Sequence, residues 1–311
     1  MYLDEIIDQI AKNLRTAFPN GYLTRFAPSP TGYLHLGHIA SMLIIQKVTA
    51  LSNGRVNLRI EDHDLSRARP EYLNAIVDDL MFLGFTFTNL NESTEKFLKG
   101  RYVQSNNLDR YKKYLKQLQD SGLVYLCECS RKEIKTRTGN SPNTDLVYDG
   151  YCKNKNIDIP TNLHSSKYSL RFKVDKDFQL KCNSDPFLNE SPKTLSSKTA
   201  ANSCGDFILL DKDNNFSYQY AVVCDDICED INVVIRGEDI LYSTPRQIEL
   251  MKALGGKKEV VYYHHPLLID DKGEKLSKRF LSTSVRDLIT SGLTKEDILE
   301  LAWNQINKKP L

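Results

Sequence analysis

The sequence has almost no net charge and no long apolar run. It contains 42 lysine and arginine residues against 40 aspartate and glutamate residues, a formal charge of +2 over 311 residues. Net charge therefore does not indicate a nucleic-acid partner, and any RNA-binding surface has to be a local patch. No stretch approaches the ~18 apolar residues that a membrane-spanning helix needs, so we expect no membrane partner.

The N-terminus also lacks the basic start and the unbroken apolar core of a signal peptide. Residues 1–18 instead carry early acids and apolar residues at helical spacing, which predicts a helix packed on the body of the protein. The cysteines number seven, an odd count, and without a secretory signal such a set is typical of a reducing compartment. We therefore expect a cytoplasmic protein.

The pattern of apolar residues and turns predicts a parallel α/β fold. Residues 22–26 have a strand pattern, a turn rich in proline and glycine follows, and a helix is expected from about Leu36 to a stop signal at residues 52–54. A second strand pattern, RVNLRI, and a helix near residues 72–83 come next. Strand, helix and strand in that order are typical of a parallel unit, whose ligands bind at the carboxyl ends of the strands.

Residues 121–205 do not follow this pattern. They are polar, with little periodicity apart from the strand-like KYSLRFKV, and we interpret them as an inserted α+β subdomain with long loops. The α/β pattern returns in DFILL, YQYAVV and INVVIRG, and two short helices are expected near the C-terminus. The expected organisation is a catalytic domain in two halves separated by the insertion and followed by a helical tail, with residues 1–120, 121–205, 206–275 and 276–311 as the four segments.

A first chemical motif, PSPTGYLHLGH, lies in the turn between the first strand and the first long helix after it. The N-terminus of a helix offers unpaired N–H groups and the positive end of a dipole, which both suit phosphates. Gly37 lets a nucleotide approach the backbone closely, and His35 and His38 add donors for a charged transition state. Taken alone, such a motif is more often a turn with a solvated histidine.

A second motif, KLSKR at residues 275–279, follows an Asp-Asp-Lys-Gly sequence. Its three cations in five residues can close over a polyphosphate, although a solvated basic loop is the more common explanation of such a run. The two motifs occur in this order, more than 230 residues apart, on either side of an α/β pattern. Their combination is much more specific than either motif alone.

Together the two motifs resemble the HIGH and KMSKS signatures of the class I aminoacyl-tRNA synthetases. The resemblance implies a Rossmann-like parallel sheet that binds ATP, with Mg²⁺, and stabilises the pentavalent transition state formed when an amino acid attacks the α-phosphate. It assigns ATP binding and catalysis to His35, Gly37, His38, Lys275, Ser277 and Lys278.

Over about residues 20–280 the sequence is also similar to the glutamate branch of that family, in RFAPSPTG, LRIED, VIRGED and TPRQ. A planar arginine fork is the natural bidentate partner of a carboxylate. The resemblance implies L-glutamate as substrate, with two arginines on its side-chain carboxylate, a tyrosine hydroxyl beside them and a glutamate on its ammonium; the implied residues are Arg25, Ala27, Ser29, Glu61, Tyr218 and Arg236. Each alone could be an ordinary ion pair or a half-buried aromatic, but the set favours a binding site.

Three cysteines of the insertion are spaced for a metal ion. Cys127 and Cys129 are followed by Cys152, and no histidine lies between them, whereas zinc takes four tetrahedral ligands, usually sulfur and nitrogen. The resemblance implies Tyr148 as the fourth ligand of one structural Zn²⁺. Three buried, reduced cysteines are the alternative explanation.

The end of the sequence bears on the acceptor. Only 32 residues follow Arg279, whereas full-length glutamyl-tRNA synthetases continue into helical domains that read the anticodon. In this respect the sequence is similar to the glutamyl-queuosine tRNA(Asp) synthetase family, which attaches glutamate to the modified wobble base of tRNA(Asp). The resemblance implies an anticodon stem-loop as RNA partner, and we expect a monomer.

Three alternatives remain open at the level of sequence. A glutamyl-tRNA synthetase without its anticodon domain would charge a tRNA 3′ end, and the C-terminal SVRDLI and KEDILELAW are similar to the start of a tRNA-stem domain. A nucleotidyltransferase acting on another acid would lack the paired Arg25 and Arg236. A synthetase-derived RNA-binding or regulatory module would be expected to lose catalytic positions, and all of them are present.

Overall fold

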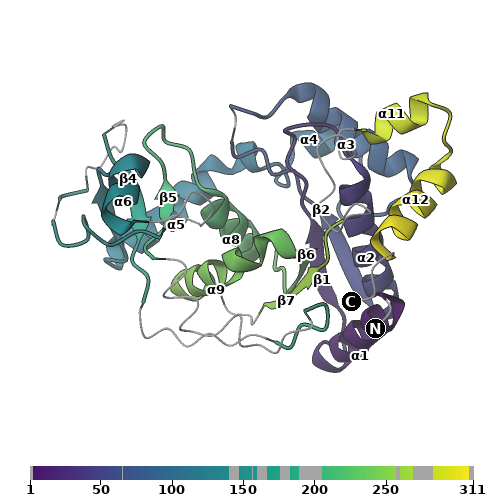
Figure 1. The fold of residues 1–311 in the computed structure, drawn as a ribbon, viewed down its shortest axis with the longest axis horizontal. Coiled ribbons are helices and arrows are strands. Elements are labelled where there is room, and N and C mark those ends of the chain that lie inside the picture. The colour runs from purple at the N-terminus through teal and green to yellow at the C-terminus, as the bar shows by residue number, and fades with distance from the viewer. Residues whose placement is uncertain are drawn as a thin grey trace.

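A computed structural model of the chain describes residues 3–64, 66–139, 147–155, 157–159, 167–175, 183–188, 205–256, 260–268 and 283–307. The molecule is elongated, with a larger lobe that holds the N-terminal helix and the C-terminal helices, and a smaller lobe at the opposite end (Figure 1). Its elements are α1 Leu3–Ala17, β1 Tyr22–Phe26, α2 Leu36–Leu51, β2 Gly54–Leu58, α3 Pro70–Phe82, α4 Thr94–Leu98, η1 Gln104–Asn107, α5 Leu108–Asp120, β3 Val124–Cys127, α6 Arg131–Thr138, β4 Ser169–Phe172, β5 Ile208–Leu210, α8 Tyr218–Cys228, β6 Val233–Gly237, η3 Glu238–Ser243, α9 Thr244–Ala253, β7 Val261–His265, α11 Val285–Thr290 and α12 Lys295–Asn307. None of the helices in these ranges combines the length and the apolar character needed to cross a bilayer.

Four parallel strands form the centre of the larger lobe. β1 pairs with β2, and β6 pairs with β7, both in parallel. Asn232, just before β6, joins the two pairs, because its Oδ1 accepts from Leu23 N at 2.7 Å and its own N–H donates to Leu23 O at 3.1 Å. The two parallel pairs therefore lie side by side, with β1 next to β6, which agrees with the parallel α/β fold expected from the sequence.

One face of this sheet is covered by α2, on which α1 and α12 pack in turn (Figure 1). Because side chains alternate along a strand, Phe26 of β1 and Ile235 of β6 point into the core on the α2 side. The residues beside them, Arg25 and Arg236, point to the other face, where they contact α8 and α9. Both arginines thus lie near the carboxyl ends of parallel strands, on one side of the sheet.

The helix α2 ends at the stop signal that the sequence predicted. Ser52 is its C-cap residue, Asn53 has a positive φ of 55°, and Gly54 starts β2. A Cβ on Gly54 would lie 2.4 Å from the Tyr22 ring, so only glycine fits between the end of α2 and β1. The Tyr22 hydroxyl also lies 2.7 Å from Ser52 Oγ, which fixes this corner of the lobe.

The smaller lobe contains an antiparallel sheet in the order β3-β4-β5. The strand expected in KYSLRFKV is present as β4. Sequence analysis placed DFILL in the second half of the catalytic domain, but this segment supplies β5, which pairs with β4. The sheet of the smaller lobe therefore extends past residue 205, to Leu210.

Candidate active site

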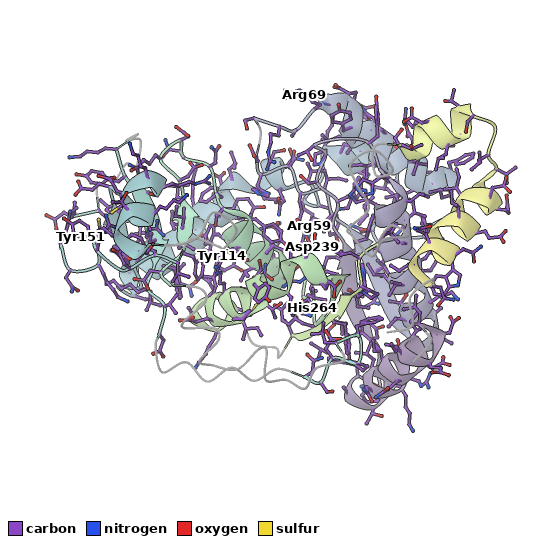
Figure 2. The ribbon with its side chains drawn as sticks, in the orientation of Figure 1. Arg59, Arg69, Tyr114, Tyr151, Asp239 and His264 are labelled. Carbon is purple, nitrogen blue, oxygen red and sulfur yellow. The ribbon has the colours of Figure 1, made fainter. Side chains whose placement is uncertain are left out.

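A cavity of about 660 Å³ opens at the carboxyl ends of β1, β6 and β7, beside the N-terminus of α2. This volume is in the usual range for small-molecule sites. Its wall includes nine residues assigned from the sequence to glutamate or ATP, namely Arg25, Ala27, Ser29, His35, Gly37, His38, Glu61, Tyr218 and Arg236. The fold brings these residues together from four separate segments of the chain, near the centre of the molecule where Arg59, Asp239 and His264 are labelled in Figure 2.

The two histidines cap the first turn of α2 through reciprocal hydrogen bonds. His35 Nδ1 accepts from Gly37 N at 3.1 Å, and His38 Nδ1 accepts from His35 N at 3.2 Å. A neutral imidazole that accepts at Nδ1 carries its proton at Nε2. Burial, with repulsion from His35, lowers the pKa of His38 to about 3. His38 is therefore neutral at physiological pH, and its Nε2–H remains a donor.

A buried series of alternating charges separates Arg25 from Glu61. Asp226 Oδ1 accepts from Arg25 Nε at 3.2 Å and lies 2.7 Å from Arg59 Nη2, which in turn lies 3.3 Å from Glu61 Oε1. Burial alone would raise the pKa of Asp226, but Arg25 and Arg59 hold it below its ordinary value. Because Arg25 and Glu61 each have a partner of their own, neither has to neutralise the other, and the cavity presents a cation and an anion together.

Arg236, only 5% exposed, is held by neutral groups. Its Nη1 donates to Gln247 Oε1 at 2.7 Å, and its Nη2 donates to Thr244 Oγ1 at 2.6 Å. Its Nε is buried without a hydrogen-bond partner in the described part of the chain. Within the described part of the chain Arg236 thus forms no ion pair, and a carboxylate ligand in the cavity would supply the counter-charge that a buried cation needs.

Tyr218, the first residue of α8, completes the polar wall of the cavity. Burial raises the pKa of Tyr218 above its ordinary value, so its phenol stays protonated and able to donate. Two arginines, one carboxylate and one phenol beside a helix N-terminus match a ligand with carboxylates and an ammonium next to a phosphate.

Lys275, Ser277 and Lys278 lie outside the described residues, but the chain on both sides of them lies at the cavity. Leu268 belongs to the cavity wall. Ser284 forms an antiparallel bridge with His35, and Val285 N donates to Leu34 O at 2.7 Å. The described residues on either side of this segment, Leu268 and Ser284, therefore both contact the site.

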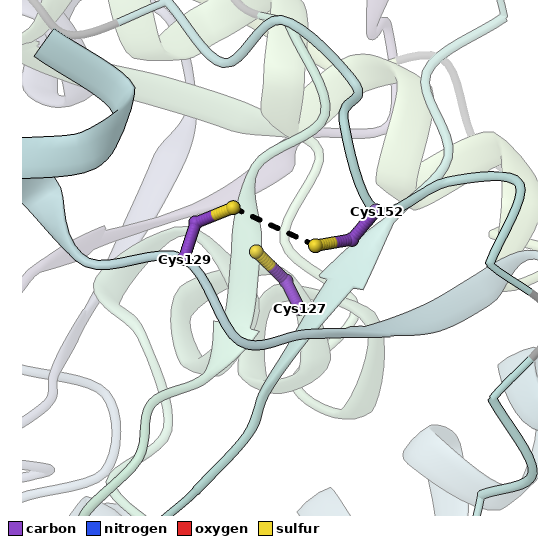
Figure 3. Close-up of side chains that lie close together, drawn as sticks. All are labelled: Cys127, Cys129 and Cys152. Carbon is purple, nitrogen blue, oxygen red and sulfur yellow. Dashed lines mark hydrogen bonds between the residues drawn. The ribbon is translucent and has the colours of Figure 1, made fainter. Parts of the chain in front are cut away.

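The four residues assigned to zinc lie together in the smaller lobe. The Sγ atoms of Cys127, Cys129 and Cys152 lie within 4.8 Å of one another, and those of Cys129 and Cys152 are 3.5 Å apart (Figure 3). The Tyr148 hydroxyl lies 3.3 Å from Cys127 Sγ and 3.7 Å from Cys129 Sγ. A tetrahedral zinc ion with Zn–S bonds of ~2.3 Å separates its sulfur ligands by ~3.8 Å, so these spacings fit a metal ion bound by all four residues.

Sequence analysis missed the residues that hold the two arginines. Asp226 stands beside Asp225 in AVVCDDIC, an otherwise apolar run of α8. Buried carboxylates require cationic partners, so this pair of acids was a usable signal. No comparable signal marks Thr244 or His264, because their contacts depend on how α9 and β7 pack in three dimensions.

Known proteins are similar to this chain in sequence and in fold. Residues 22–302 match the family of tRNA synthetases class I (E and Q), catalytic domain. A glutamyl-Q tRNA(Asp) synthetase of Nitratidesulfovibrio vulgaris is 36% identical and is matched over 88% of this chain and 83% of its own length. Another, of Rhodobacter capsulatus, is 32% identical over 90% of this chain and 99% of its own length.

A solved structure agrees with these relatives. The crystal structure of a glutamate tRNA ligase from Elizabethkingia meningosepticum in complex with its amino acid has a TM-score of 0.63 and 27% identity to this chain. The match covers 88% of this chain and 53% of that ligase, so this chain spans about half of the ligase's length.

Proposed function

Because this chain belongs to the class I tRNA synthetases of the glutamate and glutamine type, we propose that it uses ATP to activate L-glutamate. The chain matches the catalytic domain of that family and is a ligase of the aminoacyl-tRNA synthetase type. We propose further that it transfers the glutamate to queuosine at the wobble position of tRNA(Asp). One observation carries the choice of substrate: Arg236 is a buried cation with neutral partners, in a cavity that also contains Arg25 and Glu61.

The charges of the cavity match those of glutamate. In the proposed complex Arg25 and Arg236 bind the side-chain carboxylate, Tyr218 donates its hydroxyl, and Glu61 holds the ammonium, while Ala27 and Ser29 line the substrate. Glutamine would turn an amide NH₂ group toward the donors of Arg236 and leave the buried cation without a counter-charge. This mismatch supports an acid over its amide as the substrate.

Activation requires an oxygen of the α-carboxylate of glutamate to attack the α-phosphorus of ATP while the bond to pyrophosphate breaks. In the transfer step a hydroxyl of queuosine attacks the carbonyl carbon of the adenylate, and AMP leaves. We assign stabilisation of the negative charge on the phosphate to His35, His38 and the positive end of the α2 dipole, while Gly37, which has no side chain, leaves room for the phosphate. We assign the pyrophosphate end of ATP to Lys275, Ser277 and Lys278, because the described residues on either side of them, Leu268 and Ser284, contact the site. Bound Mg²⁺ would neutralise part of the phosphate charge.

The proposed acceptor is tested by the position of the new bond. We expect labelled glutamate on tRNA(Asp) that contains queuosine and none on the same tRNA without it. An isolated anticodon stem-loop with queuosine, which has no 3′ acceptor end, is also expected to be labelled, because unstacked loop bases can be read by side chains. Label confined to the 3′ end of a glutamate or glutamine tRNA would support the alternative, a glutamyl-tRNA synthetase activity.

We also propose that Cys127, Cys129, Tyr148 and Cys152 bind one structural Zn²⁺, whose bonds would tie β3 to the following loop. Metal analysis of protein purified without chelator is expected to find about one zinc per chain, lost in Cys127→Ser and Cys152→Ser. Cys228→Ser is the matched control, because Cys228 lies in α8, apart from the cluster. Metal-free protein that is stable and active would rule the site out.

A further inference from the structure

Residues 183–188 belong to the long polar insertion, yet they lie against β7 in the larger lobe. Tyr262 N donates to Asn183 Oδ1, and Asn183 Nδ2 donates to Tyr262 O, both at 2.9 Å. Two residues later Asp185 Oδ2 accepts from His264 N at 2.7 Å and lies 3.0 Å from His264 Nδ1. Phe187, 4% exposed, is buried in the same core as the α2 face of the sheet. Residues 183–188 are therefore an integral part of the larger lobe.

A series of hydrogen bonds leads from Asp185 to Arg236. A carboxylate only accepts, so His264 carries a proton at Nδ1; burial lowers the pKa of His264, so its ring is neutral and its Nε2 is left to accept. Thr244 Oγ1 lies 2.8 Å from His264 Nε2 and accepts from Arg236 Nη2 at 2.6 Å. Since a guanidinium only donates, Thr244 gives its single proton to His264. We call the series Asp185, His264, Thr244 and Arg236 the Asp185 relay. Each proton in its hydrogen bonds has one possible position.

Nη1 of Arg236 is held by a different set of hydrogen-bond partners. Gln247 Oε1 accepts from Nη1 at 2.7 Å, Gln247 Nε2 donates to Gln219 Oε1 at 2.9 Å, and Gln219 Nε2 lies 2.7 Å from Ser243 Oγ. All of these partners are neutral. Among the described residues, the Asp185 relay is the one hydrogen-bonded series that links a carboxylate to Arg236.

From this arrangement we propose that Asp185 is a positioning residue for recognition of the substrate's side chain. It fixes the tautomer of His264, which fixes the Thr244 hydroxyl and, through it, the plane of the Arg236 fork. The inference rests on the proposed function, since it takes Arg236 as the group that binds the side-chain carboxylate of glutamate. It also gives part of the polar insertion a role in the site.

The relay matters because a bidentate contact requires the guanidinium and the carboxylate to lie in one plane. A fork that rotates loses one of its two hydrogen bonds to the substrate. The loss falls on an acid more than on its amide, because only the acid uses both donors. Damage to the relay should therefore weaken glutamate binding and also reduce discrimination against glutamine.

The test is glutamate-dependent exchange of pyrophosphate into ATP, measured with full-length variants. Asp185→Ala is expected to raise KM for glutamate about tenfold and to lower the preference for glutamate over glutamine, with KM for ATP changed less than about twofold. Thr244→Val cuts the relay at its other end without touching residues 183–188, and the same pattern is expected. Because both changes break one relay, the double variant should be no worse than about the more severe single variant.

Asn183→Ala is the matched control. It removes the neighbouring attachment to β7 but leaves the relay intact, so KM for glutamate is expected to stay within about twofold of the unmodified protein. An equal rise in KM for Asn183→Ala and Asp185→Ala would reduce Asp185 to a docking contact and overturn the proposal, as would independent, multiplicative effects in the double variant. Absence of glutamate-dependent exchange in the unmodified protein would instead refute the proposed function, whereas normal exchange with an unaffected Asp185→Ala would refute only the relay.

Discussion

Arg236→Ala is expected to lower kcat/KM for glutamate in pyrophosphate exchange by about 100-fold or more. In the proposed complex the substitution removes a bidentate contact made of two charge-assisted hydrogen bonds, each worth ~1.5–3 kcal/mol. It also removes the buried cation that opposes the side-chain carboxylate, so KM for glutamate should rise much more than KM for ATP. The measurement is steady-state exchange at varied glutamate and at varied ATP.

Two further variants sharpen this experiment. Arg236→Lys keeps the charge but loses the planar fork, and an intermediate loss is expected. Arg69→Ala removes an exposed arginine whose hydrogen bonds go to backbone carbonyls, and its kcat/KM should be that of the unmodified protein. A folded Arg236→Ala protein with normal kcat/KM would exclude Arg236 from the site.

Asp226→Ala is expected to reduce the free energy of unfolding by about 3–5 kcal/mol, the usual cost of removing one partner from a buried ion pair. Asp226 lies between Arg25 and Arg59, and its side chain is 2% exposed. Without it the two guanidinium groups face each other in the interior, with Glu61 and Glu229 left to balance them. The urea dependence of unfolding, followed by fluorescence and by circular dichroism, measures the effect.

Glu95→Ala provides the comparison. Its carboxylate lies 2.6 Å from Lys99 Nζ, but the side chain is 79% exposed, and exposed pairs contribute at most about 1 kcal/mol. A similar, small loss of stability in both variants would contradict the description of Asp226 as the centre of a buried series of charges.

The orientation of Arg25 and Arg236 follows from local sequence. Arg25 and Arg236 each stand beside a residue of the apolar core in a short strand, and the two-residue period of a strand places them on the opposite face. The end of α2 was predictable for a similar reason, since residues 52–54 combine a helix stop with a glycine that packing against Tyr22 requires.

The partners of these arginines could not be predicted in this way. Asp226 lies 201 positions from Arg25, and Asp185 lies 79 positions from His264, so local periodicity carries no information about either contact. The segment 183–188 was difficult for a second reason. Asn183 and Asp185 bind β7 with side-chain atoms, which replaces a strand ladder and leaves no alternating pattern in the sequence.

The bridge between Ser284 and His35 joins the first turn of α2 to the start of α11. Val285 N also donates to Leu34 O, and Val285 is buried in the core on the α2 side of the sheet. Because His35 and Ser284 are 249 positions apart in the sequence, the backbone that carries the capping histidine takes its final shape only when the C-terminal helices have docked.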